Sequence, residues 1–129
     1  MPVKVRSRIE KLGVKPGSRV AVVGVDDRKF RRQLLARDAK LFPGPPRKNT
    51  DFIFFQAQNT TALKRLRALS TRLASNGAIW IVYPKGRREI TQNDVMAAGK
   101  AAGLVDVKVV SFSYTHTALK FVIPLSRRP

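Results

Sequence analysis

The residues best placed to do chemistry stand at the end of an apolar stretch near the start of the chain. Gly24, Asp26 and Asp27 close a predicted strand, Arg19 to Val25. In α/β domains, nucleotides and related cofactors bind at the carboxyl end of such a buried strand, where a glycine lets the backbone approach the ligand. These three residues are therefore the candidate cofactor-binding set.

A complete dinucleotide or methyl-donor site needs more than these residues. It needs several glycines in the first turn, and an acid about 20 residues further on to bind the ribose hydroxyls. This turn has one glycine, and the window near the next strand, Phe42 to Pro45, has no carboxylate. Helix capping also accounts for one of the two acids. We therefore predict no bound cofactor and a non-catalytic domain; the alternative is an S-adenosylmethionine (SAM)-dependent methyltransferase with an unorthodox site.

A second candidate site consists of cations. Lys85, Arg87 and Arg88 follow a predicted central strand, Ala78 to Tyr83, at the sheet edge where ligands bind, so they could hold a phosphate or a carboxylate. The alternative is a solvated basic loop. With the cations of the helix Asp27 to Ala36 and of the loop beyond it, the candidate polyanion-binding residues are Lys85, Arg87, Arg88, Arg28, Arg31, Arg32, Arg47 and Lys48.

The charge of the whole chain points in the same direction. Twenty-six Lys and Arg face eight Asp and Glu, which gives a formal net charge of +18. Small soluble domains usually carry a net charge of about 2 to 8 in magnitude. Such an excess favours association with polyanions, above all RNA or DNA. The alternative is an arginine-rich surface that serves solubility alone, and no RNP, KH or zinc-finger motif decides between the two.

Several classes of function are disfavoured. The chain has one histidine, His116, and no cysteine, so neither a zinc site nor thiolate chemistry is expected. It has no Gly-x-Ser-x-Gly elbow and no phosphate-binding Gly-x-x-x-x-Gly-Lys loop. His116 falls in a predicted hairpin turn, where we expect it to be exposed. No window reaches the roughly 18 apolar residues of a membrane span, and we expect a cytoplasmic protein with no membrane partner.

The strands that must position these residues follow from the apolar pattern. Three nearly unbroken apolar runs are typical of parallel strands that are covered on both faces: Arg19 to Val25, Asp51 to Ala57 and Ala78 to Tyr83. We expect these three to be neighbours at the centre of the sheet. A short strand, Ala39 to Phe42, should lie on the other side of the first.

Two later strands with alternating apolar residues, Val105 to Ser113 and Thr117 to Leu125, predict an antiparallel pair at the sheet edge. In the first of them three valines should share one face: Val105, Val107 and Val109. This exposed edge hairpin could pair two copies of the chain. A structural, homodimeric subunit is therefore a third alternative.

Helical spacing of apolar residues predicts the segments between the strands. The predicted helices are Val5 to Leu12, Asp27 to Ala36, a helix capped by Asn59 or Thr60 that runs to about Ala74, and one from Thr91 to Ala102. Asp26 or Asp27 should cap the second helix, and Thr91 with Asp94 should form a capping box on the last. The apolar residues expected to face the sheet are Phe30, Leu34 and Leu35, and then Leu63, Leu66, Leu69 and Leu73.

Parallel strands that alternate with helices and end in an antiparallel pair predict one α/β domain over residues 1–129. Its helices should cover both faces of the sheet, which gives a three-layer α/β/α sandwich with right-handed crossovers.

Four segments carry a resemblance to a known family: Lys11 to Val20 (KLGVKPGSRV), Gly77 to Lys85 (GAIWIVYPK), Asp94-Val95 with Ala101 to Val109 (AAGLVDVKV), and Leu119 to Val122 (LKFV). The chain resembles a bacterial domain-of-unknown-function family with a Rossmann-like, shortened class I SAM-methyltransferase fold. The resemblance implies that fold and supplies no activity. The chain departs from the family at Ser113 to His116, where the family has an acidic residue and a tryptophan.

Overall fold

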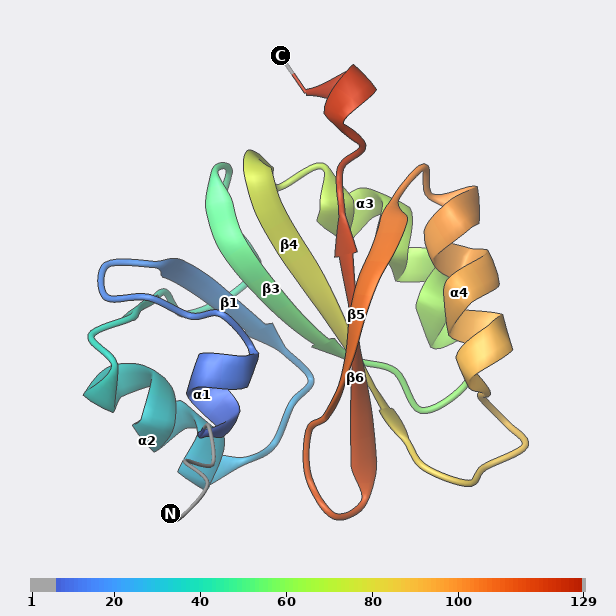
Figure 1. The fold of residues 1–129 in the computed structure, drawn as a ribbon, viewed down its shortest axis with the longest axis horizontal. Helices are drawn as coiled ribbons and strands as arrows, with labels where there is room; N and C mark the ends of the chain where they lie inside the picture. The colour runs from blue at the N-terminus through green and yellow to red at the C-terminus, as the bar shows by residue number, and fades with distance from the viewer. Residues whose placement is uncertain (1–6, 129) are drawn as a thin grey trace, which may run out of the picture.

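The computed structural model describes residues 7–128, which contain a single six-stranded sheet. The strands are β1 (Arg19–Val23), β2 (Lys40–Leu41), β3 (Thr50–Gln56), β4 (Leu73–Pro84), β5 (Val105–Ser111) and β6 (His116–Val122). Their order in the sheet is β2-β1-β3-β4-β6-β5 (Figure 1). The predicted neighbours are confirmed: β1, β3 and β4 are adjacent at the centre, and β2 lies on the other side of β1.

The first four strands are parallel, and β6 is antiparallel to both of its neighbours, β4 and β5. The chain therefore forms the expected mostly parallel sheet with an antiparallel pair at its end. The pair is ordered differently from the chain, because β6 inserts between β4 and β5. Only β5 of the hairpin lies at the edge.

Helices cover both faces of this sheet. They are α1 (Arg8–Lys11), α2 (Arg28–Ala36), α3 (Leu66–Ser70) and α4 (Gln92–Ala101), with 3₁₀ turns η1 (Ala62–Arg65) and η2 (Leu125–Arg127). Figure 1 shows α1 and α2 on one side and α3 and α4 on the other. Side chains of the central strands alternate between two cores, so Ile53 and Phe55 pack toward α3 and α4 while Phe54 packs toward α2. The three-layer α/β/α sandwich is confirmed.

Polar side chains fix where two helices begin. Asp27 caps α2, because its Oδ1 accepts a hydrogen bond from the N–H of Phe30 at 2.9 Å. Thr91 and Asp94 form the predicted capping box at the start of α4. Both caps satisfy N–H groups that have no partner inside the helix.

The predicted first helix is shorter than expected over its described part, and Val5 and Arg6 lie outside the described residues.

The helix predicted to run to about Ala74 was wrong in its extent. Asn59 does accept a hydrogen bond from the N–H of Ala62 at 3.0 Å, but α3 ends at Ser70. Leu73 is buried as predicted, yet it belongs to β4 and pairs with Thr50 of β3. A leucine at helical spacing can be buried equally well in the strand that follows, so the period alone misplaced the boundary.

One residue predicted to face inward does not, and the alternation predicted for β5 also differs. Leu35 is 58% exposed, although Phe30 and Leu34 are fully buried. The three valines of β5 are 44–57% exposed, because β5 is the outermost strand and no helix covers it fully. A register shift between Asp106 and Lys108 places these two residues opposite Phe121 and Lys120, which point to different faces of the sheet. The simple alternation predicted for β5 is therefore broken.

Among residues 7–128, no helix is both long and apolar enough to cross a membrane.

Candidate functional site

The β5–β6 hairpin folds back against the carboxyl ends of the parallel strands and creates two neighbouring hollows. The first, here called the acidic cavity, has a volume of about 180 Å³ and is lined by Asp26, Asp27, Gln56 and the hairpin. The second, here called the cationic cleft, has a volume of about 420 Å³. Its lining residues are Gln58, Pro84, Lys85, Arg87, Tyr114, Thr115 and His116. Thr115 and His116 line both hollows and separate them.

In the acidic cavity, Asp27 is engaged by the protein itself. Its Oδ2 lies 3.1 Å from Arg8 Nη1, and its Oδ1 accepts the cap bond from Phe30. Arg8 also donates to Gln33 Oε1 at 2.9 Å and to the carbonyl of Phe112 at 3.0 Å. Arg8 and Asp27 thus tie α1, α2 and the base of the hairpin together, which is a structural role.

Burial by itself would raise the pKa of Asp27, but the N–H of Phe30 and the bond and charge of Arg8 outweigh it and lower the pKa overall. A carboxyl whose pKa is lowered by folding adds stability above its unfolded pKa, and that stability is lost as the pH falls through the lowered folded value. We therefore expect stability to fall below about pH 4. Asp27→Asn keeps a good cap and removes the charge, so the stability of this variant should fall less as the pH is lowered. Denaturation curves measured from pH 6 to pH 2 test this.

Replacing Asp27 with alanine removes the cap as well as the charge. Asp27→Ala should therefore cost about 1–2 kcal/mol at pH 7. The two variants separate the contributions, because only the alanine leaves the Phe30 N–H without its partner. A loss of similar size for Asp27→Asn at pH 7 would mean that the ion pair with Arg8, and not the cap, carries the stability.

The acidic cavity does not fit SAM. Its volume is below the roughly 300–1,000 Å³ of typical small-molecule pockets, and the Asp27 carboxylate is already satisfied. Gly24 has a φ of +77°, and an added Cβ would meet the carbonyl of Gln56 only at 3.6 Å. The left-handed backbone therefore requires this glycine, and the approach of a ligand is not needed to explain it. Among the described residues no three His, Cys, Asp or Glu side chains gather to hold a metal ion.

In the cationic cleft, Lys85 joins the loop after β4 to the hairpin. Its backbone N–H donates to the carbonyl of Thr115 at 2.9 Å, and its Nζ donates to Ser111 Oγ at 2.7 Å. Arg87 lines the same cleft and is exposed. The ammonium of Lys85 is therefore held in place at the mouth of the cleft, with donors left for a ligand.

His116 lies between the two hollows and is half-buried, whereas the sequence predicted an exposed residue. Its Nδ1 is 2.8 Å from Thr115 Oγ1, and its Nε2 is buried without a hydrogen-bond partner. Burial lowers the pKa of His116, and the charges of Arg87 and Lys85 lower it further. These cations create a positive potential in the cleft, and within residues 7–128 neither of them forms a salt bridge with a carboxylate.

The structure divides the predicted cations between two ends of the sheet. Lys85, Arg87 and Arg88 follow β4 and Arg28 follows β1, so these four cations lie at the carboxyl end of the parallel strands. Arg31 and Arg32 are exposed further along α2. Arg47 and Lys48 precede β3 and so lie at the opposite, amino-terminal end of the sheet. There the Arg47 guanidinium stacks over the Phe42 ring at 4.6 Å. The eight candidate residues therefore do not form one site.

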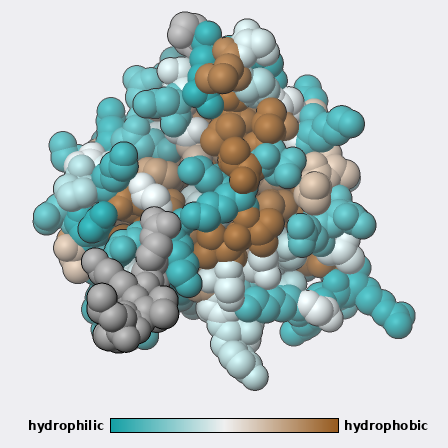
Figure 2. All heavy atoms as spheres, viewed as in Figure 1, coloured by the Kyte–Doolittle hydropathy of each residue, from teal (hydrophilic) through white to brown (hydrophobic). Residues whose placement is uncertain are grey.

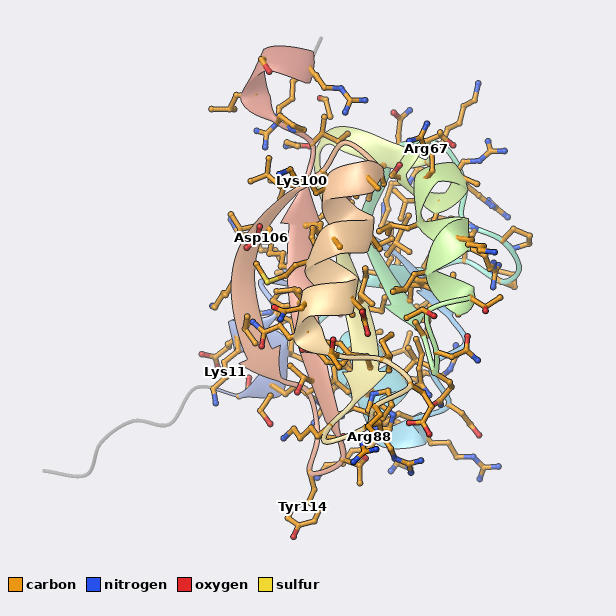
Figure 3. All side chains as sticks on the ribbon, turned by 90° about the vertical axis from the view of Figure 1, so that its right-hand side faces the viewer. Lys11, Arg67, Arg88, Lys100, Asp106 and Tyr114 are labelled. Atoms are coloured by element: carbon orange, nitrogen blue, oxygen red, sulfur yellow. The ribbon has the colours of Figure 1, made fainter. Side chains whose placement is uncertain are left out.

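Sequence reasoning missed Tyr114 and Gln58 as parts of the site. Tyr114 is 97% exposed at the tip of the hairpin (Figure 3), which places an uncovered aromatic ring beside the cations. The signal in the sequence was a tyrosine inside a predicted turn, a position where an aromatic side chain is not needed to fill the core. Gln58 gave no signal, since nothing in the sequence indicates that it reaches the loop after β4.

Comparison with known proteins identifies similar folds but no matching family and no matching curated protein. A SAM-dependent methyltransferase from Aquifex aeolicus has a similar structure, with a TM-score of 0.70 and 16% identity over 90% of this chain and 87% of that one. Fibrillarin from Methanococcus jannaschii, a pre-rRNA processing protein, has a TM-score of 0.58 and 13% identity over 84% of this chain and 67% of that one.

LepI in complex with SAM is also similar, with a TM-score of 0.56 and 17% identity over 90% of this chain and 39% of LepI. The methyltransferase-like fold is therefore confirmed. The resemblance to a bacterial domain-of-unknown-function family stays a prediction, because no family model matches.

Proposed function

We propose that this methyltransferase-like domain is non-catalytic and binds nucleic acid through its cations. The observation that carries the proposal is a large excess of Lys and Arg side chains that have no carboxylate partner within the described fold. The chain has 26 Lys and Arg against eight Asp and Glu, and within residues 7–128 one ion pair has both partners described, Arg8 with Asp27. Cations that are not paired within the fold are free to neutralise phosphates and to release the counterions condensed on a nucleic acid.

The carboxyl end of the sheet is the best place for this contact. Lys85 and Arg87 line a cleft there, Arg88 is exposed on the same loop, and Arg28 opens α2 after β1 at the same end of the sheet. A cleft lined by charges of one sign between low-dielectric walls concentrates the potential and attracts a polyanion. Burial is the main reason that the pKa of His116 is lowered, and the charges of Arg87 and Lys85 lower it further.

A methyltransferase that uses SAM is the alternative, and the fold itself favours it, since similar structures include SAM-dependent enzymes. Against it stand the small volume of the acidic cavity and the engagement of Asp27 by Arg8. The similar fibrillarin takes part in pre-rRNA processing, which is compatible with a polyanionic partner for this fold.

The test is a titration of labelled 20-nucleotide RNA and DNA with the protein at 50 mM salt, followed by fluorescence anisotropy, with SAM tested in parallel by calorimetry. We expect binding of nucleic acid and no heat with SAM. Replacing Lys85, Arg87 and Arg88 together with serine should weaken binding. The matched control removes three exposed cations elsewhere, Lys11, Lys15 and Lys40, and should weaken binding less. Heat with SAM and no shift with nucleic acid would reverse the proposal.

Self-association through β5 is a second candidate, favoured by the exposed valines of this edge strand. Val105, Val107 and Val109 are 44%, 57% and 48% exposed, and Figure 2 shows an apolar patch on the face where β5 and β6 lie. Unpaired edge strands are templates for pairing with a second copy. Sedimentation at increasing concentration tests it: a dimer would form more readily at high salt, which screens the repulsion of two +18 chains. A monomer at every concentration and salt removes this candidate.

A further inference from the structure

The aromatic ring of Tyr114 does not contribute to the packing of the protein. It is 97% exposed, and Figure 3 shows it at the tip of the hairpin, pointing away from the body of the protein. An aromatic ring offers a large contact area with few rotatable bonds, so it contributes strongly once a partner covers it. In this structure nothing covers it.

The hairpin that presents Tyr114 is well fixed. Ser113 Oγ accepts hydrogen bonds from the N–H groups of Thr115 and His116, at 3.3 and 3.1 Å. The carbonyl of Thr115 accepts from the N–H of Lys85 at 2.9 Å. The backbone that carries Tyr114 is therefore held against the loop after β4 before any ligand arrives, which lowers the entropic cost of binding.

The cleft beside the ring combines four kinds of group. Lys85 and Arg87 bring cations, Gln58 brings an amide, and His116 brings a buried Nε2 that has no hydrogen-bond partner. Tyr114 forms part of the same lining. The cleft volume of about 420 Å³ lies within the range of small-molecule pockets, roughly 300–1,000 Å³. Cations for phosphate, an aromatic face for a base and polar groups for a base edge are what a nucleotide unit needs.

We propose that the cationic cleft binds single-stranded nucleic acid, with one base stacked on Tyr114 and the adjoining phosphates on Lys85 and Arg87. The proposal rests on the proposed function and adds the strandedness of the ligand. A base inside a duplex has both faces covered by its neighbours, so it has none left for the tyrosine. An unpaired base has a free face, and combining a stacking aromatic residue with a basic groove is how proteins hold single strands.

The experiment compares an unstructured 12-nucleotide strand, in RNA and DNA versions of one sequence, with a 12-base-pair duplex at fixed salt. Tyr114→Ala should weaken single-strand binding about ten-fold, as is typical when a stacking aromatic residue is removed, and should leave duplex binding unchanged. Tyr114→Phe keeps the stacking face and should bind like the original chain. Leu125→Ala, at an apolar residue that is 79% exposed and outside the cleft, is the matched control and should change neither affinity. The RNA and DNA arms show which sugar is preferred.

The outcomes separate this inference from the proposed function. If Tyr114→Ala binds both ligands as the original chain does, while removal of Lys85 and Arg87 weakens both, the stacking site is wrong and nucleic-acid binding stands. If the original chain binds neither ligand, the proposed function fails. If Tyr114→Ala weakens duplex and single strand equally, the tyrosine contacts the backbone and the single-strand preference is wrong. An unchanged melting temperature shows that the variant is folded.

Discussion

Raising the salt concentration from 50 to 200 mM should weaken nucleic-acid binding by about three orders of magnitude. The six cations at the carboxyl end and along α2 are Lys85, Arg87, Arg88, Arg28, Arg31 and Arg32. If each neutralises one phosphate, the logarithm of the association constant falls with the logarithm of salt with a slope of about −5, which over a four-fold change in salt gives a loss of about 10³. Anisotropy titrations at four salt concentrations measure this slope.

The size of the slope also tells how many cations take part. If only the three cations of the loop after β4 make contact, the slope falls to about −3 and the loss to about 40-fold. The variant with serine at Lys85, Arg87 and Arg88 should therefore reduce the slope by about 3, whereas the variant at Lys11, Lys15 and Lys40 should keep it. A slope near zero would mean that charge does not drive the association, and the proposed function would then be wrong.

Phe30→Ala should have the largest effect on stability, a loss of about 3–5 kcal/mol, as is typical for a fully buried phenylalanine. Phe30 is fully buried in the core on the α2 side of the sheet. Its ring meets the rings of Phe54 and Phe112 edge-on, with both centroid distances at 4.9 Å. Loss of the ring would leave a cavity where α2, β3 and the strand leading into the hairpin meet, and small domains have only about 5–15 kcal/mol to lose.

Urea denaturation followed by the fluorescence of Trp80, the single tryptophan, measures this loss. The matched control lies on the same helix: Leu35→Ala removes an apolar side chain that is 58% exposed, and it should change stability by less than about 0.5 kcal/mol. A cost below about 1 kcal/mol for Phe30→Ala would contradict the packing around Phe30, since a cavity of this size cannot close without rearranging three elements.

The same packing links stability to the candidate site. Phe112 precedes the hairpin turn, and the Arg8 guanidinium lies over its ring at 4.7 Å while donating to its carbonyl. The hairpin that carries Tyr114 is thus held at its base by Phe30 and Arg8 and at its tip by Lys85. Variants that disturb Phe30 should therefore be tested for folding before any loss of binding is assigned to the cleft.

The local elements of the fold could be predicted because they depend on local chemistry. The continuous apolar runs of β1 and β3 indicate strands that are covered on both faces, and Asp27 and Thr91 mark the beginnings of α2 and α4 because short polar side chains satisfy N–H groups at helix ends. Net charge is also a property of composition, so the expectation of a polyanionic partner needed no structure. The absence of a carboxylate near Phe42, which a cofactor site would need for the ribose hydroxyls, is likewise visible in the sequence.

The tertiary structure decided what depends on contacts between distant segments. The period of the leucines could not show that Leu73 would pair with Thr50, because burial in a helix and burial in a strand leave the same pattern. The insertion of β6 beside β4 exposes the valines of β5, and chain order does not reveal it. The cationic cleft joins Lys85 to Tyr114 and His116 across a sheet edge. Residues that meet only through the packing of separate strands have no shared signal in the sequence, and for that reason the structure alone brought the cations, the tyrosine and the histidine into one site.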